Sequence, residues 1–266
     1  MEHPTTAPVH GMGIDVGGTS VKGAVMRLDD GVAMGPIVRL PTPQPPHIED
    51  VVAVIADVAA GVAGQVAEPG IALGVALSGD VRDGRHTTGV NLDDSWVDAP
   101  ARDLIEAAVG RPAHILNDAD AAALGELTHG AAAGVPGVVV VLTFGTGIGS
   151  AVLVDGRLLP NTGLGQLPFD GLPAEQLLSA VSRERRQQSW TAWADDVSRY
   201  LEQLDLLLRP DLFVIGGGII NGFGQFRHLL RSPCPLVPAA LGDRAGILGA
   251  ALAAGWAIQG SRLDSG

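Results

Sequence analysis

Lysine and cysteine are almost absent from this sequence, since each occurs once in 266 residues, as Lys22 and Cys234. A single cysteine excludes a disulfide framework and a cysteine-rich zinc site within the chain, so we expect a reducing, cytoplasmic setting and no zinc. The formal net charge of −12 disfavours nucleic acid and anionic membranes as partners. The apolar run at 246–258 is too short to span a membrane and predicts a core helix instead.

Apolar strands alternate with helical patterns along the chain, which is typical of an α/β architecture. Two segments resemble each other, GIDVGGT at 13–19 and VLTFGTG at 141–147, because each contains an apolar strand followed by a glycine turn. This near-repeat indicates two related halves. We place the boundary near residue 115, which gives a smaller domain at 1–115 and a larger one at 116–266, with a last helix able to pack back on the first.

The first glycine turn has the composition of a phosphate-binding loop. Gly17 and Gly18 let a phosphate approach the backbone N–H groups, and Thr19 adds a hydroxyl donor. Asp15, at the end of the preceding strand, is a candidate Mg²⁺ ligand through water, because Mg²⁺ prefers oxygen ligands and retains several waters. Lys22 either adds positive charge for phosphate or stabilises the hairpin. The alternative interpretation is a tight hairpin without a ligand.

A second glycine turn repeats this chemistry in the other half of the chain. Two such turns acting on one triphosphate end would position it for transfer, and positioning is most of phosphoryl-transfer catalysis. The candidate phosphate-binding residues of this turn are Thr143, Gly145, Thr146 and Gly147. A third glycine run follows a predicted strand and suits a phosphate or a flat ligand against the backbone. Its members are Gly216, Gly217 and Gly218.

A carboxylate follows the predicted strand at 113–116. Asp118 is a candidate catalytic base, because a kinase acting on an alcohol needs a carboxylate within hydrogen-bond reach of the attacking hydroxyl. The alternative, of similar weight, is a helix N-cap, since Asp118 opens an alanine-rich helical segment. Asn117 offers a donor and an acceptor to neighbouring hydroxyls. Asn91, in the loop at 91–96, is a further polar candidate or a turn-forming residue.

These motifs together resemble the ROK family of sugar kinases, and within it the actinobacterial polyphosphate glucokinases. The resemblance runs through nearly the whole chain. It is carried by GIDVGGTSVKG (13–23), PTPQP (41–45), NLDDSW (91–96), ILNDADAAALGE (115–126), VLTFGTGIGSA (141–151), PDLFVIGGGI (210–219) and AGILGAALAA (245–254).

The resemblance implies an actin-like ATPase (ribonuclease H-like) fold, with two lobes and a central cleft. It also implies Mg²⁺, a donor that is ATP or polyphosphate, and transfer to the primary hydroxyl of a hexose. Asp118 is then the base, Asn117 and Asn91 contact the sugar, and the glycine turns bind phosphate. A homodimer is the expected assembly.

Two departures from the family pattern concern the sugar. The family's Glu-x-Gly-His becomes GLGQ at 163–166, so that Gly163 and Gln166 replace two residues that grip the C1/C2 side of glucose. A charged hydrogen bond contributes roughly 1.5–3 kcal/mol, so this loss predicts a weaker hold on glucose. The family's Pro-Gly becomes Ser78-Gly79, which reshapes the acceptor site. We therefore expect a glucose-like sugar, amino sugar, cyclitol or glycoside altered at the C1/C2 side.

A third departure concerns the donor. Basic residues expected from the family are missing at 130–137 and 221–226, which favours ATP over polyphosphate as donor, because a polyanion needs neutralising charge. The arginine-rich segment at 183–186 is interpreted as a solvated helix face, with a donor-binding patch as its alternative.

Two other functions stay open besides a kinase acting on an altered sugar. One is an ordinary polyphosphate/ATP glucokinase. The other is a catalytically inactive sensor of sugar or nucleotide, which the retained Asp15 and Asp118 oppose because a pure binder does not need them.

Overall fold

The computed structural model describes residues 9–67, 70–87 and 92–263, and the chain separates into two compact units. Unit 1 comprises residues 1–125 and 244–266, and unit 2 comprises residues 126–243. These bounds differ from the predicted domains at 1–115 and 116–266. The difference arises because the helix after residue 117 begins within unit 1 and the last helix returns to it.

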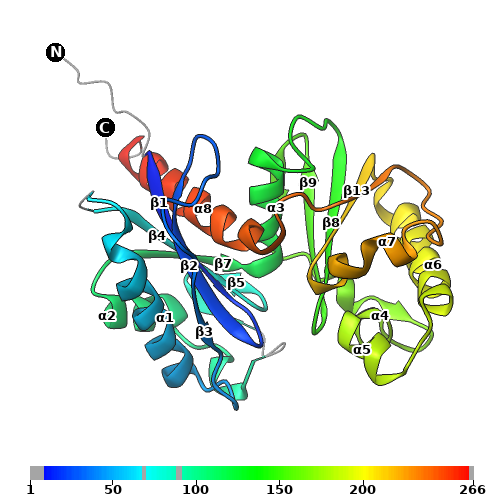
Figure 1. Cartoon of the computed structure of the whole chain (residues 1–266), viewed down its shortest axis with the longest axis horizontal. Helices are drawn as coiled ribbons and strands as arrows, with labels where there is room; N and C mark the ends of the chain where they lie inside the picture. Colours follow the sequence, from blue (N-terminus) through cyan, green and yellow to red (C-terminus); the bar gives the residue numbers. More distant parts are fainter. Residues whose placement is uncertain (1–8, 68–69, 88–91, 264–266) are drawn as a thin grey trace. The chain divides into compact units, whose positions relative to one another are not determined.

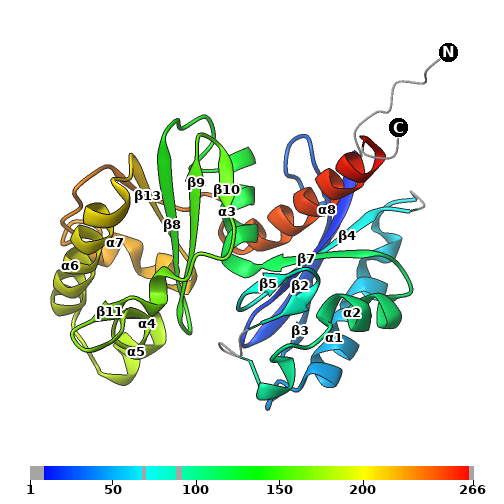
Figure 2. The ribbon, with the colours of Figure 1, turned by 180° about the vertical axis from the view of Figure 1, so that it is seen from behind.

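Unit 1 contains a five-stranded sheet and a small hairpin, covered by helices. Its elements are β1 (His10–Val16), β2 (Ser20–Arg27), β3 (Val38–Pro41), α1 (Ile48–Val62), β4 (Ala72–Leu77), β5 (Val81–Arg82), β6 (Arg85–His86), α2 (Ala101–Val109), β7 (Ala113–Asn117), the start of α3 (Asp118–His129) and α8 (Ala245–Leu263). The strand order is β3-β2-β1-β4-β7, with β1, β4 and β7 parallel and β2 antiparallel to both neighbours. Figures 1 and 2 show α1 and α2 on one face and α8 on the other.

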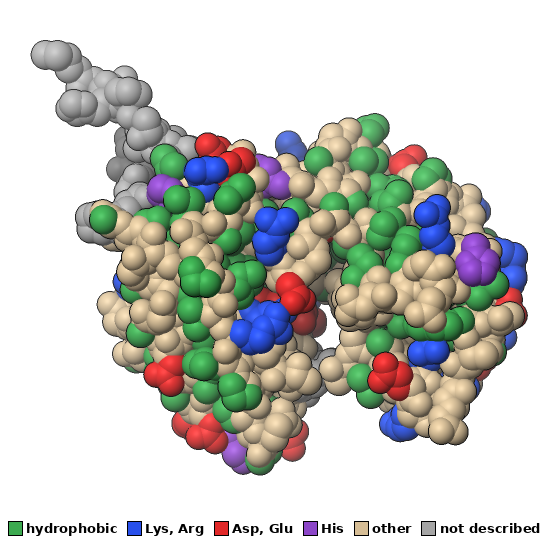
Figure 3. Space-filling model, in the orientation of Figure 1, with side chains coloured by type: hydrophobic (Ala, Val, Ile, Leu, Met, Phe, Trp, Pro, Cys, Tyr) green, Lys and Arg blue, Asp and Glu red, His purple; other side chains and the backbone are tan. Residues whose placement is uncertain are grey.

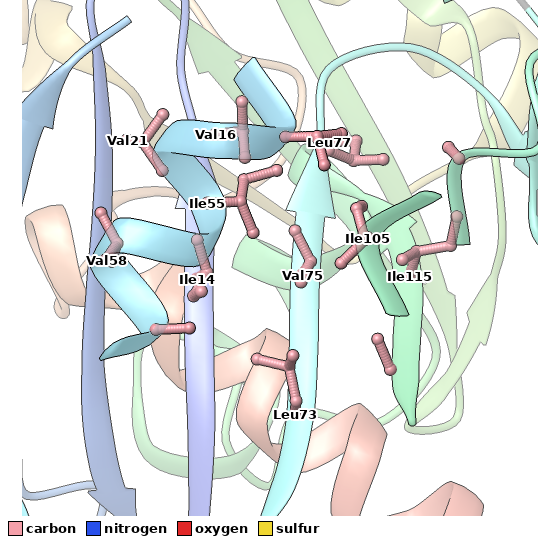
Figure 4. Packing of buried hydrophobic residues seen from close by; sticks show 14 of the residues in the cluster. Ile14, Val16, Val21, Ile55, Val58, Leu73, Val75, Leu77, Ile105 and Ile115 are labelled. Atoms are coloured by element: carbon pink, nitrogen blue, oxygen red, sulfur yellow. The ribbon is translucent and has the colours of Figure 1, made fainter. Parts of the chain in front are cut away.

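An apolar stripe of α1 packs on the sheet of unit 1. Ile55 and Val58 lie three residues apart, which places them on the same side of the helix, and both are fully buried. Figure 4 shows them against Ile14 of β1 and Val75 of β4, whose side chains point to this face. Burial of each such side chain contributes about 1.5–3 kcal/mol. The stripe therefore stabilises the parallel strands β1 and β4, and with β1 the position of Asp15 near its end.

The opposite face of this sheet contacts α8 through backbone atoms. A Cβ built on Gly74 of β4 would lie 1.9 Å from the carbonyl oxygen of Ala250. A Cβ built on Gly249 would lie 1.6 Å from the carbonyl oxygen of Ala121 in α3. No side chain fits at either distance, so glycine is required for α8 to reach both the sheet and α3.

Unit 2 repeats the topology of the first sheet. Its elements are β8 (Val138–Phe144), β9 (Ile148–Val154), β10 (Arg157–Leu159), β11 (Pro168–Phe169), β12 (Leu172–Pro173), α4 (Ala174–Leu178), α5 (Ala180–Arg185), α6 (Trp190–Leu208), β13 (Leu212–Gly216), α7 (Phe223–Phe226) and β14 (Leu236–Pro238). The strand order is β10-β9-β8-β13-β14, with β8, β13 and β14 parallel. The two glycine turns of the near-repeat therefore join equivalent strands, β1 to β2 and β8 to β9.

Two segments with a helical sequence pattern, at 173–185 and 223–231, form shorter helices than the pattern predicts. The first is divided into α4 and α5 at Ser179, where the backbone is extended with ψ 158° and the hydroxyl caps a new helix by accepting the N–H of Ser182. The second is reduced to α7, since Gly222 and Gly224 are poor helix formers. Within the described residues, no helix has the length and apolar character needed to cross a bilayer.

We predict that Gly74→Ala destabilises the protein by about 2 kcal/mol or more, because the new methyl group overlaps the Ala250 carbonyl and displaces α8. The measurement is the free energy of unfolding in urea. Gly64→Ala is the matched control, since nothing lies within 4 Å of a Cβ at that position. Equal stability of the two variants would contradict the close packing of α8.

Candidate active site

The first glycine turn directs its carbonyl groups toward the protein. The Thr42 hydroxyl donates to the carbonyl of Gly17 at 2.6 Å, and the Gln44 amide donates to that of Gly18 at 3.0 Å. The backbone N–H of Thr42 donates to the carbonyl of Thr19 at 3.1 Å. Three consecutive acceptors are occupied and the Gly17 N–H donates to the Ser20 carbonyl, so the N–H groups of Gly18 and Thr19 are the backbone groups left for a ligand, which suits an anion. Thr42 and Gln44 belong to the PTPQP motif, whose role the sequence did not reveal.

Asp15 and Lys22 form an ion pair across the β1–β2 hairpin. They are direct partners in the antiparallel register, and Lys22 Nζ lies 3.1 Å from Asp15 Oδ2. Both side chains are mostly buried, with 13% and 17% of their surface exposed. The structure shows the role of Lys22 within the hairpin, and a contact of Lys22 with phosphate stays a prediction.

Asn117, not Asp118, caps helix α3. The Asn117 side-chain oxygen accepts the N–H groups of Ala119 at 2.9 Å and Asp120 at 3.0 Å, as an N-cap residue does. Its amide nitrogen donates to the carbonyl of Gly79 at 3.0 Å. The amide group still has one N–H to offer a ligand. The N-cap alternative for Asp118 is therefore wrong, and its part as the base stays a prediction.

Asp118 is the first residue of α3 and its side chain is partly buried. One carboxylate oxygen accepts the N–H of Ala119 at 2.8 Å. Burial and repulsion by the Asp15 carboxylate nevertheless raise the pKa of Asp118 from 3.8 to about 7. A carboxylate with a pKa near neutrality is well matched to accepting a proton from an alcohol as that alcohol attacks.

His86 is a buried residue that sequence reasoning missed. Its ring is fully buried, and Nε2–H donates to the carbonyl of Ser78 at 2.5 Å. The ring packs edge to face on Trp96, at a centroid distance of 5.4 Å. Burial lowers the pKa of His86, so that the neutral ring is favoured. His86 thus holds the Ser78–Gly79 turn, whose Gly79 carbonyl in turn accepts the Asn117 amide.

Asn91, predicted to contact the sugar, lies outside the described residues. The remainder of its motif is ordered around Trp96, whose indole N–H donates to the carbonyl of Pro46 at 2.9 Å. Ser95 accepts the backbone N–H of Ile48 at 3.0 Å. The NLDDSW motif therefore packs against the start of α1.

The second and third glycine segments meet in unit 2. The turn after β8 closes with the N–H of Gly145 donating to the carbonyl of Gly147 at 3.0 Å. Gly217 has a φ of 80°, and a Cβ there would lie 2.6 Å from the carbonyl oxygen of Phe144. Thr143 on β8 is paired with Gly216 on β13, so both segments leave neighbouring parallel strands at the same edge. Thr146 is exposed at the tip of its turn.

One predicted acceptor residue of unit 2, Gln166, contacts a second carboxylate. The Gln166 amide donates to Glu175 Oε1 at 2.7 Å, and the N–H of Ile148 lies 3.3 Å from Glu175 Oε2. A Cβ built on Gly163 would meet nothing within 4 Å, so that position borders open space. Burial and the nearby Glu175 carboxylate raise the pKa of the Tyr200 phenol. Glu175 was missed by sequence reasoning because it lies outside the GLGQ segment, at the start of α4.

Comparison with known proteins decides the family. Residues 11–165 match the ROK family. The chain belongs to the ROK family. It is 43% identical over 249 residues to a polyphosphate glucokinase of Mycobacterium tuberculosis, an alignment that covers 93% of this chain and 92% of that protein. It is also 43% identical to a polyphosphate glucokinase of Mycobacterium leprae, over 94% of this chain and 76% of that protein.

Solved ROK structures share the fold. An inorganic polyphosphate/ATP-glucomannokinase from Arthrobacter sp. strain KM matches with a TM-score of 0.91 and 41% identity, over 95% of this chain and 100% of that one. A Streptomyces griseus ROK family glucokinase in complex with glucose and AMPPNP matches with a TM-score of 0.76 and 25% identity, over 92% and 99% of the two chains. The predicted actin-like α/β fold is confirmed. This ROK protein is a phosphotransferase that acts on a sugar hydroxyl.

A magnesium site at Asp15 stays a prediction. Among the described residues, no group of three His, Cys, Asp or Glu side chains could hold a metal ion. Mg²⁺ commonly binds through one or two carboxylates and completes its shell with substrate phosphate and water, so one aspartate suffices. A cation at Asp15 would supply charge neutralisation to a transferring phosphoryl group.

The raised pKa of Asp118 predicts a pH-dependent gain in stability for Asp118→Asn. The folded state favours the protonated carboxyl, so stability from this group is present below pH 3.8 and is lost as pH rises through about 7. Asn cannot ionise, so the variant should be more stable at pH 8, on the order of 2 kcal/mol, and nearly unchanged at pH 4. Thermal unfolding across this pH range measures it. Asp57→Asn, on the exposed side of α1, is the control. A gain that shrinks as pH rises would contradict the assignment.

We predict that His86→Leu lowers kcat of this ROK kinase while leaving the protein folded. Without the Nε2–H donor, the Ser78 carbonyl is left unsatisfied at a cost of about 1–3 kcal/mol, and the turn that orients Asn117 loosens. His86→Gln places an amide donor near the same point and should restore most of the activity. Steady-state kinetics and melting temperature are measured together. If both variants lose stability and kcat equally, His86 is a packing residue only.

Proposed function

We propose that this ROK kinase phosphorylates glucose or a close hexose, using polyphosphate or ATP, with Asp118 as the base. The observation that carries the chemistry is the environment of Asp118, a carboxylate released from helix capping and held at a pKa of about 7. The 43% identity to polyphosphate glucokinases favours an ordinary glucokinase over the altered-sugar hypothesis suggested by the sequence. It also returns polyphosphate to the proposed donors, against the preference for ATP.

The proposed reaction moves one phosphoryl group and one proton. The primary hydroxyl oxygen of the sugar forms a bond to the terminal phosphorus of the donor, and the bridging P–O bond of the donor breaks. The leaving group is ADP or a polyphosphate shorter by one unit. Asp118 accepts the hydroxyl proton, while the N–H groups of the first glycine turn bind phosphate and Asp15 would hold a Mg²⁺ ion that neutralises phosphate charge.

Glu175 supports glucose as the acceptor despite the altered GLGQ segment. A carboxylate held by Gln166 and the Ile148 N–H keeps further lone pairs for sugar hydroxyls. Gln166 adds a neutral amide where the family has histidine. We infer that the charge lost at position 163 is offset in part by Glu175, which lies in the same part of unit 2.

A second acceptor class is favoured by one observation. The open space at Gly163 leaves room for a substituent that a larger side chain would exclude. A hexose substituted at C1 or C2, such as an amino sugar or a glycoside, is therefore the second candidate. A homodimer and a cytoplasmic location remain predictions.

A kinetic panel tests the proposal. Glucose, mannose, glucosamine, methyl glucoside and a cyclitol are offered with ATP or polyphosphate as donor, and sugar phosphate formation is measured. We expect glucose to give the highest kcat/KM with both donors, and Asp118→Asn to lower kcat by a factor of about 100 or more while the fold is retained.

The outcomes of this panel are distinct. A substituted sugar that exceeds glucose tenfold would establish the second candidate instead. Normal turnover by Asp118→Asn would remove Asp118 as the base. Asp57→Asn is the control for the charge change and should retain wild-type rates.

A further inference from the structure

Three arginines lie next to the second glycine turn in unit 2. The N–H of Val181, in the first turn of α5, donates to the carbonyl of Gly145 at 3.2 Å. Arg183, Arg185 and Arg186 follow within five residues, so their backbone lies about 3–8 Å further along the helix direction. Arg183, Arg185 and Arg186 are called the arginine patch below.

The arginine patch carries positive charge that is not neutralised by an ion pair. In the part of unit 2 that the structure describes, three other arginines each contact an aspartate. These pairs are Arg199 with Asp170, Arg209 with Asp205, and Arg231 with Asp195. No such partner lies within 4.0 Å of the patch in the same described residues. Figure 3 shows acidic and basic side chains interspersed over the visible face of each unit.

Two members of the patch are held in place by contacts with their surroundings. The Arg183 guanidinium lies 3.4 Å from the centroid of the Trp190 ring, and Arg186 Nη1 donates to the carbonyl of Leu177 at 3.1 Å. Arg185 and Arg186 are exposed. Because two of the side chains are partly ordered, less conformational entropy is lost when they bind an anion.

Trp190 connects the patch to the third glycine segment. Its ring stacks on Phe226 of α7 at a centroid distance of 5.0 Å, and its indole N–H donates to Gln225 at 2.8 Å. A Cβ on Gly222 would lie 2.9 Å from the Trp190 ring. The patch therefore adjoins the turn at 145–147 through Val181 and the segment after Gly216–Gly218 through Trp190.

We propose that the arginine patch binds the phosphates of a polyphosphate donor that extend beyond the second glycine turn. This inference rests on the proposed function and names the donor for which these residues select. ATP has only three charged phosphates, whereas every phosphate of a polyphosphate is charged, so a bound polyphosphate needs cationic side chains along its whole length. Arginine suits this part because its planar group binds phosphate oxygens in pairs. In this proposal, the arginine patch takes the place of the basic residues missing at 130–137 and 221–226.

The test is the double variant Arg185→Ala/Arg186→Ala, compared with Arg157→Ala/Arg209→Ala. Both remove two positive charges from unit 2. Arg157 and Arg209 are exposed and lie where β10 and β13 begin, beside the start of β8 and so at the opposite end of the sheet from Gly145. KM is measured with ATP and with polyphosphates of increasing length, and direct binding of a long polyphosphate is measured without sugar.

We expect the patch variant to raise KM and Kd for long polyphosphate about tenfold, with ATP kinetics changed less than about twofold. The effect should grow with chain length and shrink at high salt. The control variant should match the wild type. An equal loss with ATP, no loss with polyphosphate, or a wild type that does not bind polyphosphate would overturn the inference. Failure of the wild type to phosphorylate glucose would count against the proposed function alone, because the binding measurement needs no acceptor.

Discussion

The backbone-to-backbone packing of α8 is the constraint on which the candidate site of unit 1 depends. Its small residues let it approach β4 at Gly74 and α3 at Ala121. Gly246, in its first turn, faces the Asp15 carboxylate, and a Cβ there would lie 2.9 Å from Asp15 Cγ. One helix of small residues therefore fixes both the strand that carries Asp15 and the helix that begins with Asp118.

This arrangement brings two carboxylates close enough to interact unfavourably. The repulsion adds to the cost of burying Asp118 and moves its pKa toward neutrality, which is where a proton acceptor for an alcohol is effective. Lys22 offsets the charge of Asp15 through the ion pair of the hairpin. The only lysine of the chain thus lies in an ion pair within the hairpin, and the cations that we propose for the donor are arginines instead.

Local sequence patterns predicted the parts of the candidate site that are formed by a few consecutive residues. The glycine turns and Asp118 were recognisable because a strand, a turn and a polar residue follow one another directly. The sequence did not show which residue caps α3, since neighbouring Asn117 and Asp118 have similar capping propensity. Only the geometry of α3 identifies Asn117 as the cap. The contacts of Thr42 with Gly17, 25 residues away, and of His86 with Ser78 depend on how strands and loops meet, which no local pattern records.

The segment at 163–166 shows that a residue missing from a sequence motif can be replaced by one from elsewhere in the chain. In sequence, GLGQ at 163–166 has lost a glutamate, and the loss of a charged contact predicted a different sugar. In space, Glu175 contacts Gln166 and the Ile148 N–H, because α4 follows the β11–β12 hairpin back toward the second glycine turn. A carboxylate therefore contacts the last residue of the altered segment, Gln166. Specificity depends on the charges that surround a ligand, so the proposed contribution of Glu175, nine positions after Gln166, is visible only from the contacts of the folded chain.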